Sequence, residues 1–186
     1  DMEEIVKDGD NLLIYYSGHG QKKVTLSTNE EKFYWIPVNA KRKYDGRTWL
    51  STSFIKDKAS DFTASHVLIM VDSCFSGIKK GTSAVTDKEV NTADVMSLKR
   101  NQNAIGREYI SSGANEQVED TDGGTYSAFA KAFIHSLNSN RNHISSEEIY
   151  LKIKRFVTAK TEQKPQMNHI EDADHSYGVF VFSAKN

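Results

Sequence analysis

Short apolar runs separated by polar segments predict the strands of this chain. Leu12–Tyr16, His66–Val71 and Tyr109–Ser111 are apolar or aromatic and are bounded by turn-forming or polar residues, as buried strands are. His66–Val71 shows no alternation of apolar and polar positions, which is typical of a central parallel strand covered on both faces. A further run, Gly178–Phe182, predicts a closing strand.

Weaker patterns predict a peripheral hairpin and a short helix. Val24–Leu26 and Phe33–Ile36 flank the polar segment Ser27–Glu30 and are expected to pair with each other. Thr52–Asp61 is expected to form a short helix. The side chains expected to face the sheet are Phe54, Ile55 and Lys58.

Two longer helices follow in the second half of the chain. The first has apolar residues at the i, i+3, i+4, i+7 spacing of a core-facing stripe. This stripe consists of Tyr126, Phe129, Ala130, Phe133, Ile134 and Leu137. The second helix begins at Ser145, where Ser145 and Glu148 match a capping box. Its apolar face consists of Ile149, Ile153, Phe156 and Val157.

Strands that alternate with helices predict an α/β fold with a mostly parallel sheet. In such sheets, functional sites form at the carboxyl ends of the strands. His19 and Cys74 each lie just past the end of a predicted buried strand, in turns of small residues. If these two strands are parallel neighbours, the two side chains lie at the same edge of the sheet.

Composition narrows the class of protein. The chain has 186 residues, of which 38% are hydrophobic and 26% charged, so we expect one water-soluble globular domain over residues 1–186. A formal net charge of −1 gives no reason to expect nucleic acid as a partner. The apolar runs are far shorter than the ~20 residues that span a bilayer, so no membrane association is expected. The single cysteine excludes an internal disulfide and fits a reducing compartment such as the cytoplasm.

Cys74 and His19 together predict nucleophilic catalysis. A thiol attacks as its thiolate, and an imidazole can take its proton and later deliver that proton to a leaving amine. His19 precedes Cys74 by 55 residues (74 − 19), close to the separation found in caspases. Gly18 and Gly20 allow a sharp turn and close approach to a ligand. The backbone amides of Gly20 and Cys74 are then candidates for an oxyanion hole.

The segments YYSGHG (15–20) and DSCFSG (72–77) resemble the two catalytic motifs of the caspase-like peptidase family, and most closely its metacaspase and bacterial orthocaspase branches. WIPV (35–38) lies where that family has an "IPvD" segment, although Asn39 replaces the usual acid. GTYS (124–127) and GVFVF (178–182) also fit, so that the similarity covers nearly the whole chain. The resemblance implies a caspase-like three-layer sandwich and a cysteine endopeptidase.

Asp72 stands where caspases have glutamine, two positions before the nucleophile. In the metacaspase-like branches, an aspartate there lines the pocket for the residue before the scissile bond. The resemblance therefore implies a peptide or protein substrate with Arg or Lys at that position, because a carboxylate attracts a cation and repels an acid. Ser17 and Ser112 are expected to line the same pocket. The alternative is that Asp72 caps the strand end through local hydrogen bonds.

The resembling enzymes begin with a strand and a helix that precede the YYSGHG strand. Here only residues 1–7 precede Asp8, and this first strand and helix are not evident. We therefore expect an N-terminal segment or another chain to complete the domain. Without it, the sheet would present an open edge.

The long polar stretch after Cys74, residues 78–106, predicts a flexible processing loop. Enzymes of this kind are often cut there during activation, so we expect self-cleavage. The candidate sites are Lys79, Lys80, Lys99, Arg100 and Arg107.

No cofactor is expected. Some metacaspase-like enzymes need calcium, but the acidic residues 119–122 lack the ligand spacing of a calcium loop and are interpreted as a solvated loop. His169 and His175 flank acidic residues and are interpreted as part of a polar surface loop, not as a zinc site.

Two other functions remain open at this stage. The first is a non-catalytic caspase-like scaffold that binds a partner protein, which would have no need of both Cys74 and His19. The second is another cysteine-dependent acyl transfer, such as ligation.

Overall fold

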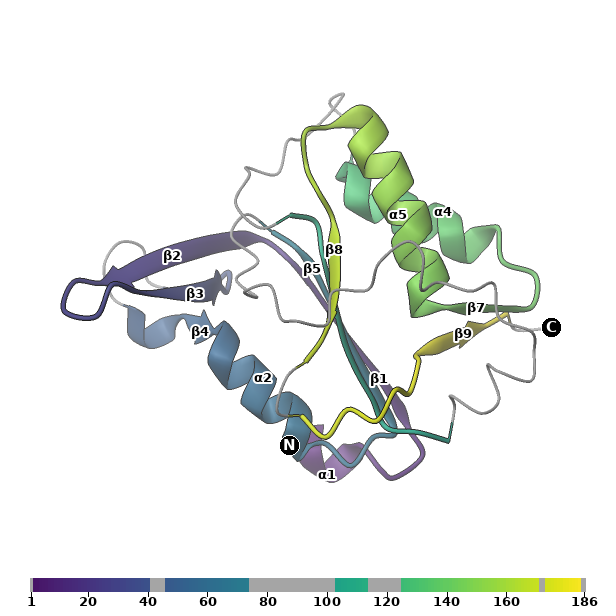
Figure 1. The fold of residues 1–186 in the computed structure, drawn as a ribbon, viewed down its shortest axis with the longest axis horizontal. Helices are drawn as coiled ribbons and strands as arrows, with labels where there is room; N and C mark the ends of the chain where they lie inside the picture. The colour runs from purple at the N-terminus through teal and green to yellow at the C-terminus, as the bar shows by residue number, and fades with distance from the viewer. Residues whose placement is uncertain (1, 41–45, 74–102, 114–124, 171–172, 185–186) are drawn as a thin grey trace.

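A computed structural model describes residues 2–40, 46–73, 103–113, 125–170 and 173–184 (Figure 1). Its central sheet has four strands, in the order β1 (Asn11–Ser17), β5 (His66–Asp72), β6 (Gly106–Ser111) and β8 (Gln166–His169). β1, β5 and β6 run parallel, while β8 is antiparallel to β6. The expected α/β fold with a mostly parallel sheet is therefore confirmed.

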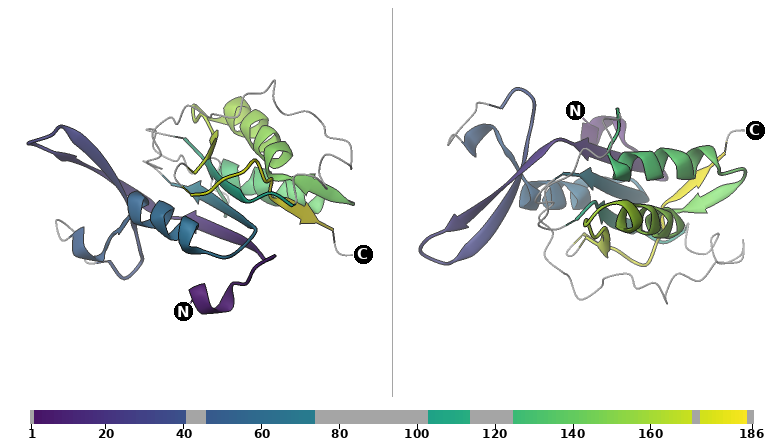
Figure 2. Two further views of the ribbon diagram at one scale, coloured as in Figure 1. Left: turned by 60° about the horizontal axis from the view of Figure 1, so that its bottom comes forward. Right: turned by 90° about the horizontal axis from the view of Figure 1, so that it is seen from above.

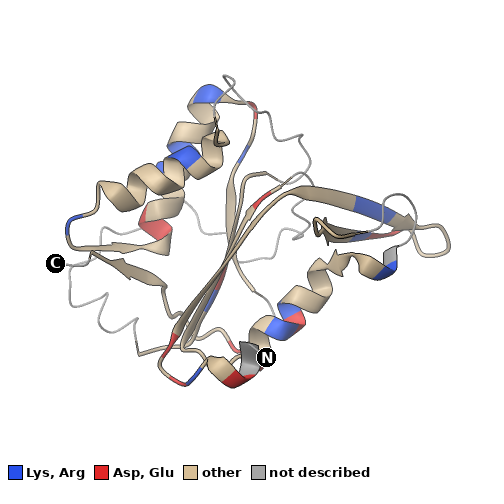
Figure 3. Cartoon of the chain, turned by 180° about the vertical axis from the view of Figure 1, so that it is seen from behind, with Lys and Arg blue, Asp and Glu red and all other residues tan. Residues whose placement is uncertain are grey.

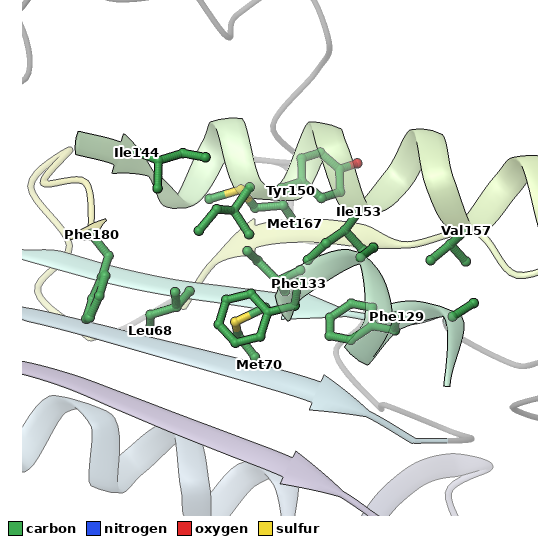
Figure 4. Close-up of a cluster of buried hydrophobic side chains, with 14 residues drawn as sticks. Leu68, Met70, Phe129, Phe133, Ile144, Tyr150, Ile153, Val157, Met167 and Phe180 are labelled. Carbon is green, nitrogen blue, oxygen red and sulfur yellow. The ribbon is translucent and has the colours of Figure 1, made fainter. Parts of the chain in front are cut away.

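Helices cover the central sheet on both faces. Every residue of β5 is buried, because its side chains alternate between two apolar cores. Leu68 and Met70 point into a core shared with α4 (Ala128–Asn138) and α5 (Ser146–Lys160) (Figure 4). Val67, Ile69 and Val71 face the other core, which α2 (Thr52–Asp61) covers.

Helix α2 has the predicted bounds, but its buried face differs from the prediction. Thr52 and Ala59 are its buried residues, and Ile55 packs at the margin of the core. Phe54 was expected to face the sheet, yet 50% of its surface is exposed. The residues of α2 that meet the core are therefore Thr52, Ile55 and Ala59, and not Phe54.

The predicted stripe and cap of the two long helices are largely confirmed. Phe129 and Phe133 are buried on α4. Two members of the predicted stripe are exposed instead: Tyr126, which precedes the helix, and Ile134. α5 begins with the expected capping box of Ser145 and Glu148. Figure 3 shows acidic residues at the beginning of α5 and basic residues further along it, an arrangement that complements the helix dipole.

The closing strand differs from the prediction. Val181–Ser183 forms β9, but it pairs with β7 (His143–Ser145) in a separate two-stranded sheet. The central sheet ends instead with β8, whose polar sequence gave no apolar signal. Two hydrogen bonds fix the backbone of Phe180, one to the start of α5 and one to a side chain of β6. The Phe180 carbonyl accepts from the Ser146 amide, and the Phe180 amide donates to Glu108.

An antiparallel hairpin of β2 (His19–Thr25) and β3 (Glu30–Ile36) extends away from the helical layers (Figures 1 and 2). β3 also pairs with the short β4 (Leu50–Ser51), which follows a 3-10 turn, Gly46–Thr48. The predicted hairpin is confirmed, with longer arms than the apolar residues indicated. A short N-terminal helix, α1 (Met2–Ile5), precedes β1. No helix in the described ranges is both long and apolar enough to cross a membrane.

Candidate active site

β1 and β5 are direct parallel neighbours (Figure 1). Ser17 lies opposite Asp72 at their carboxyl ends. The amide of Gly18 donates to the carbonyl of Asp72 over 3.4 Å, which holds the two chain segments together just beyond the strands. His19 lies two residues after Ser17, and Cys74 lies two residues after Asp72. Cys74 itself is outside the described residues. The expected neighbourhood of the two strands is confirmed.

His19 is the first residue of β2 and lies opposite Ile36 of β3, with an exposed side chain. Its backbone is fixed by the Tyr16 hydroxyl, which donates to the His19 carbonyl over 2.7 Å. The same hydroxyl accepts from the Ile36 amide over 3.0 Å. The turn that carries His19 is thus tied to the root of the hairpin.

Gly18 has a packing role that the sequence did not indicate. It does not adopt a positive φ, so left-handed backbone is not the reason for a glycine here. An added Cβ would lie 2.8 Å from the Tyr16 hydroxyl oxygen and 3.0 Å from the ring carbon that bears it. Gly18 is required because the Tyr16 side chain folds beneath the turn.

The Asp72 side chain is only 4% exposed and faces the beginning of α4. Its Oδ2 accepts from the Ser127 hydroxyl and, over 3.4 Å, from the Tyr15 hydroxyl. Burial raises the pKa of Tyr15, and the nearby Asp72 carboxylate raises this pKa further. Neither Tyr15 nor Ser127 was identified from the sequence as a partner of Asp72. The position of Ser127 just before an amphipathic helix was the available signal, because it marks an N-cap.

The two serines expected near Asp72 lie at the same edge of the sheet. Ser17 is exposed and lies directly across from Asp72. Ser112 is fully buried, and its hydroxyl donates to the Ser73 carbonyl over 3.4 Å. Its amide donates to the Val71 carbonyl over 2.9 Å. Ser112 therefore supports the backbone that leads to Cys74.

Gly20 lies within β2, opposite Trp35. The second amide expected in the oxyanion hole belongs to Cys74 and is outside the described residues. Four expected cleavage sites, Lys79, Lys80, Lys99 and Arg100, also lie outside them, as does most of the expected processing loop.

The fifth expected cleavage site, Arg107, lies inside β6 and is 4% exposed. Its guanidinium donates to the carbonyls of Phe62, Ser65 and Gly106. Burial lowers the pKa of this guanidinium. Cleavage after Arg107 would require β6 to leave its place between β5 and β8.

The expected loop around His169 and His175 is more ordered than the sequence indicated. His169 ends β8, and its ring stacks on that of His175 at a centroid distance of 3.8 Å. Burial, aided by the charges of His169 and Arg107, lowers the pKa of His175 to about 4. Within the described ranges, no three His, Cys, Asp or Glu side chains are grouped as metal ligands would be. Residues 119–122 lie outside these ranges.

Comparison with known proteins gives one assignment. A family model described as the caspase domain matches residues 2–175 of the chain. A search of the curated proteins found no match. The matched range includes both motifs and all four strands of the central sheet.

Proposed function

Since this chain belongs to the caspase domain family, we propose that it is a cysteine endopeptidase with Cys74 as nucleophile and His19 as acid and base. The observation that carries the proposal is the parallel pairing of β1 with β5, with Ser17 opposite Asp72. This pairing sends the two segments that contain His19 and Cys74 out of the sheet at the same edge. The carboxyl ends of parallel strands are where α/β folds build their sites.

The proposed reaction has two stages. His19 takes the proton of the Cys74 thiol, and the thiolate attacks the carbonyl carbon of the scissile peptide bond. The C–N bond then breaks, and His19 delivers its proton to the leaving amine, which leaves a thioester on Cys74. His19 next takes a proton from water, which attacks the thioester and releases the acid and the thiol. The amides of Gly20 and Cys74 are the proposed donors to the oxyanion.

We further propose that the substrate residue before the scissile bond is Arg or Lys. Asp72 is buried at the strand end, where a carboxylate attracts a cation more strongly than it would in open water. Ser17 and Ser112 are the proposed neighbours of that pocket. The aspartate at position 72 favours the metacaspase and orthocaspase branches, since caspases have glutamine there.

Hydrolysis of short peptides tests both parts of this proposal. The wild-type protein is expected to cleave a peptide that has Arg before the scissile bond. It is expected not to cleave the same peptide with Asp at that position. Cys74→Ala and His19→Ala are each expected to abolish cleavage. Asp72→Asn is expected to raise KM for the Arg peptide. Equal or inverted preference would exclude the Asp72 role while leaving the Cys74–His19 role intact.

A non-catalytic scaffold is the competing function, and the reactivity of Cys74 separates the two. A peptidase nucleophile is expected to react with iodoacetamide at neutral pH, and its labelling is expected to fall in His19→Ala. An inert thiol in the folded wild-type protein would favour the scaffold.

We also propose self-processing within residues 78–106, because this stretch carries five basic residues, of which Lys79, Lys80, Lys99 and Arg100 are the candidate sites. Intact-mass analysis of the wild type and of Cys74→Ala tests it. Fragments are expected in the wild type alone, and fragments in both would contradict self-cleavage.

The outer edge of β1 is the proposed place for an additional strand. Within the described ranges, β1 pairs with β5 on one side and with no strand on the other. Leu13 and Tyr15 on this strand are partly exposed. We propose that an N-terminal segment or another chain pairs there. Size-exclusion chromatography with light scattering distinguishes a second copy of the chain from a partner in the same chain.

A further inference from the structure

We propose that Tyr16 is a positioning residue that holds His19 in place for proton transfer. The inference rests on the proposed peptidase function and concerns the same site. Its basis is the Tyr16 hydroxyl, which bridges the backbone of His19 and the backbone of Ile36.

The hydroxyl of Tyr16 uses its hydrogen-bonding capacity entirely on the backbone. The hydroxyl has one proton and donates it to the nearer acceptor, the His19 carbonyl at 2.7 Å. The Ile36 carbonyl, at 3.1 Å, is the more distant alternative acceptor. The hydroxyl oxygen accepts from the Ile36 amide at 3.0 Å. The hydroxyl therefore joins the two residues that lie opposite each other where β2 and β3 meet the sheet.

The ring of Tyr16 is itself fixed on the core. It stacks on Trp35 with a centroid distance of 4.6 Å and an interplanar angle of 6°. Trp35 is 4% exposed and belongs to the apolar core beneath α2. Through these contacts, the Tyr16 ring connects the buried core to the carbonyl of His19.

The turn above Tyr16 leaves room for this arrangement only because residue 18 is glycine. A Cβ there would approach the Tyr16 oxygen to 2.8 Å. Burial raises the pKa of Tyr16, and the hydrogen bond with Ile36 opposes that rise, so the hydroxyl keeps its proton at neutral pH and remains a donor to His19.

Holding the backbone of His19 affects proton transfer more than substrate binding. The imidazole side chain is exposed and its direction is set by a backbone that leaves one strand and enters another within two residues. A misplacement of about 1 Å at a catalytic group can reduce a rate about 100-fold. The Tyr16 hydroxyl contacts the backbone of His19 and Ile36, whereas the pocket proposed to bind the substrate side chain is built around Asp72.

Tyr16→Phe removes this hydroxyl and keeps the ring on Trp35. We expect kcat for an Arg peptide to fall about 10- to 100-fold with KM within about two-fold of the wild type. The matched control is Tyr177→Phe, because Tyr177 is exposed and packs against His169 and His175 away from this site. This control is expected to keep the wild-type kcat and KM.

A second readout separates positioning from a loss of stability. The pH dependence of iodoacetamide labelling of Cys74 reports the thiolate that His19 supports, and in Tyr16→Phe its midpoint is expected to move upward toward that of His19→Ala. Thermal unfolding of the same samples is recorded. The kinetics and the labelling are then measured at a temperature where all variants are folded.

The two proposals fail in different ways. An inactive wild type, or a His19→Ala variant with full activity, would overturn the proposed function. A folded Tyr16→Phe variant with wild-type kcat and labelling midpoint, in an active background, would overturn the positioning role alone. A rise in KM without a change in kcat would also overturn it.

Discussion

The hydroxyl of Ser127 caps helix α4 and also donates to the carboxylate of Asp72. As an N-cap it accepts from the Ala130 amide over 2.9 Å, so one side chain serves both the helix and the candidate specificity residue. The proposed substrate pocket is therefore built against the beginning of a core helix and not against a loop alone.

Ser127→Ala is expected to weaken both functions of that hydroxyl. Loss of an N-cap costs about 1 kcal/mol of stability, and loss of a donor to Asp72 is expected to raise KM for an Arg peptide. Ser145→Ala is the matched control, because Ser145 caps α5 and lies away from Asp72. It is expected to reduce stability similarly with KM unchanged. Equal KM values in the two variants would contradict a role of Ser127 in the pocket. Peptide kinetics and urea denaturation measure the two effects.

Gly18→Ala is expected to lower activity through Tyr16. The new methyl group would meet the Tyr16 hydroxyl, and relief requires that the ring or the turn shift. In a Tyr16→Phe background, the nearest oxygen is gone, so the same substitution is expected to have a smaller effect on kcat. The double-mutant cycle measures this coupling. Full additivity of the two substitutions would show that the close contact does not control activity.

Because of Glu108, the free energy of unfolding is expected to fall as pH rises from the unfolded to the folded pKa of this residue. Its carboxyl group is buried between β6 and the start of α5. Burial raises its pKa from 4.5 to about 8, although hydrogen bonds from the Phe180 amide and the Ser146 hydroxyl act in the opposite direction. The folded state therefore binds the proton more tightly, so this contribution is complete below pH 4.5 and is lost as pH rises to about 8.

Glu108→Gln keeps an acceptor at that position and removes the titration. Urea unfolding at pH 5 and at pH 7.5 is expected to show a smaller loss of stability with rising pH in this variant than in the wild type. An identical pH dependence in both proteins would exclude Glu108 as its source.

His175 is expected to give the free energy of unfolding the opposite dependence on pH, in a lower pH range. Burial lowers its pKa from 6.5 to about 4, so the folded state binds its proton less tightly than the unfolded chain does. This contribution to stability is present above pH 6.5 and is lost as pH falls to about 4. The ring accepts a hydrogen bond from the Arg107 amide through Nδ1. His175→Asn keeps an acceptor and is expected to flatten the loss of stability between pH 6.5 and 4, measured by urea unfolding. A slope as steep as that of the wild type would count against His175.

Local patterns predicted much of the fold. Thr52–Asp61 matches α2 at both ends, and the Ser145 capping box marks the start of α5. The unbroken apolar run of β5 indicated burial on both faces, which the two cores explain. In each case the signal and its physical cause lie within a few residues of sequence.

The elements that the sequence patterns did not predict are fixed by contacts between residues distant in sequence. β8 has the sequence QMNH, and its place in the sheet comes from pairing with β6 and not from its own hydrophobicity. The segment around Phe180 is directed by Glu108 and Ser146, which are distant in sequence.

At the candidate site, the sequence motifs identified His19, Asp72 and Cys74, but they carried no sign of the supporting contacts. Tyr16 holds His19 through a hydroxyl that also contacts Ile36. Ser127, the N-cap of α4, contacts Asp72 although it lies 55 residues later in the sequence. Such contacts depend on how separate elements pack, which periodicity does not report.

β5 has a neighbouring strand on each side, whereas β1 has one on a single side within the described ranges. Backbone amides of β1 should therefore exchange with deuterium faster than those of β5, because less structure must open to expose them. When no additional strand pairs with β1, the candidate base therefore follows the strand that we expect to open more easily, and the nucleophile follows the strand that we expect to open less easily. On warming, inactivation should precede the loss of helical signal.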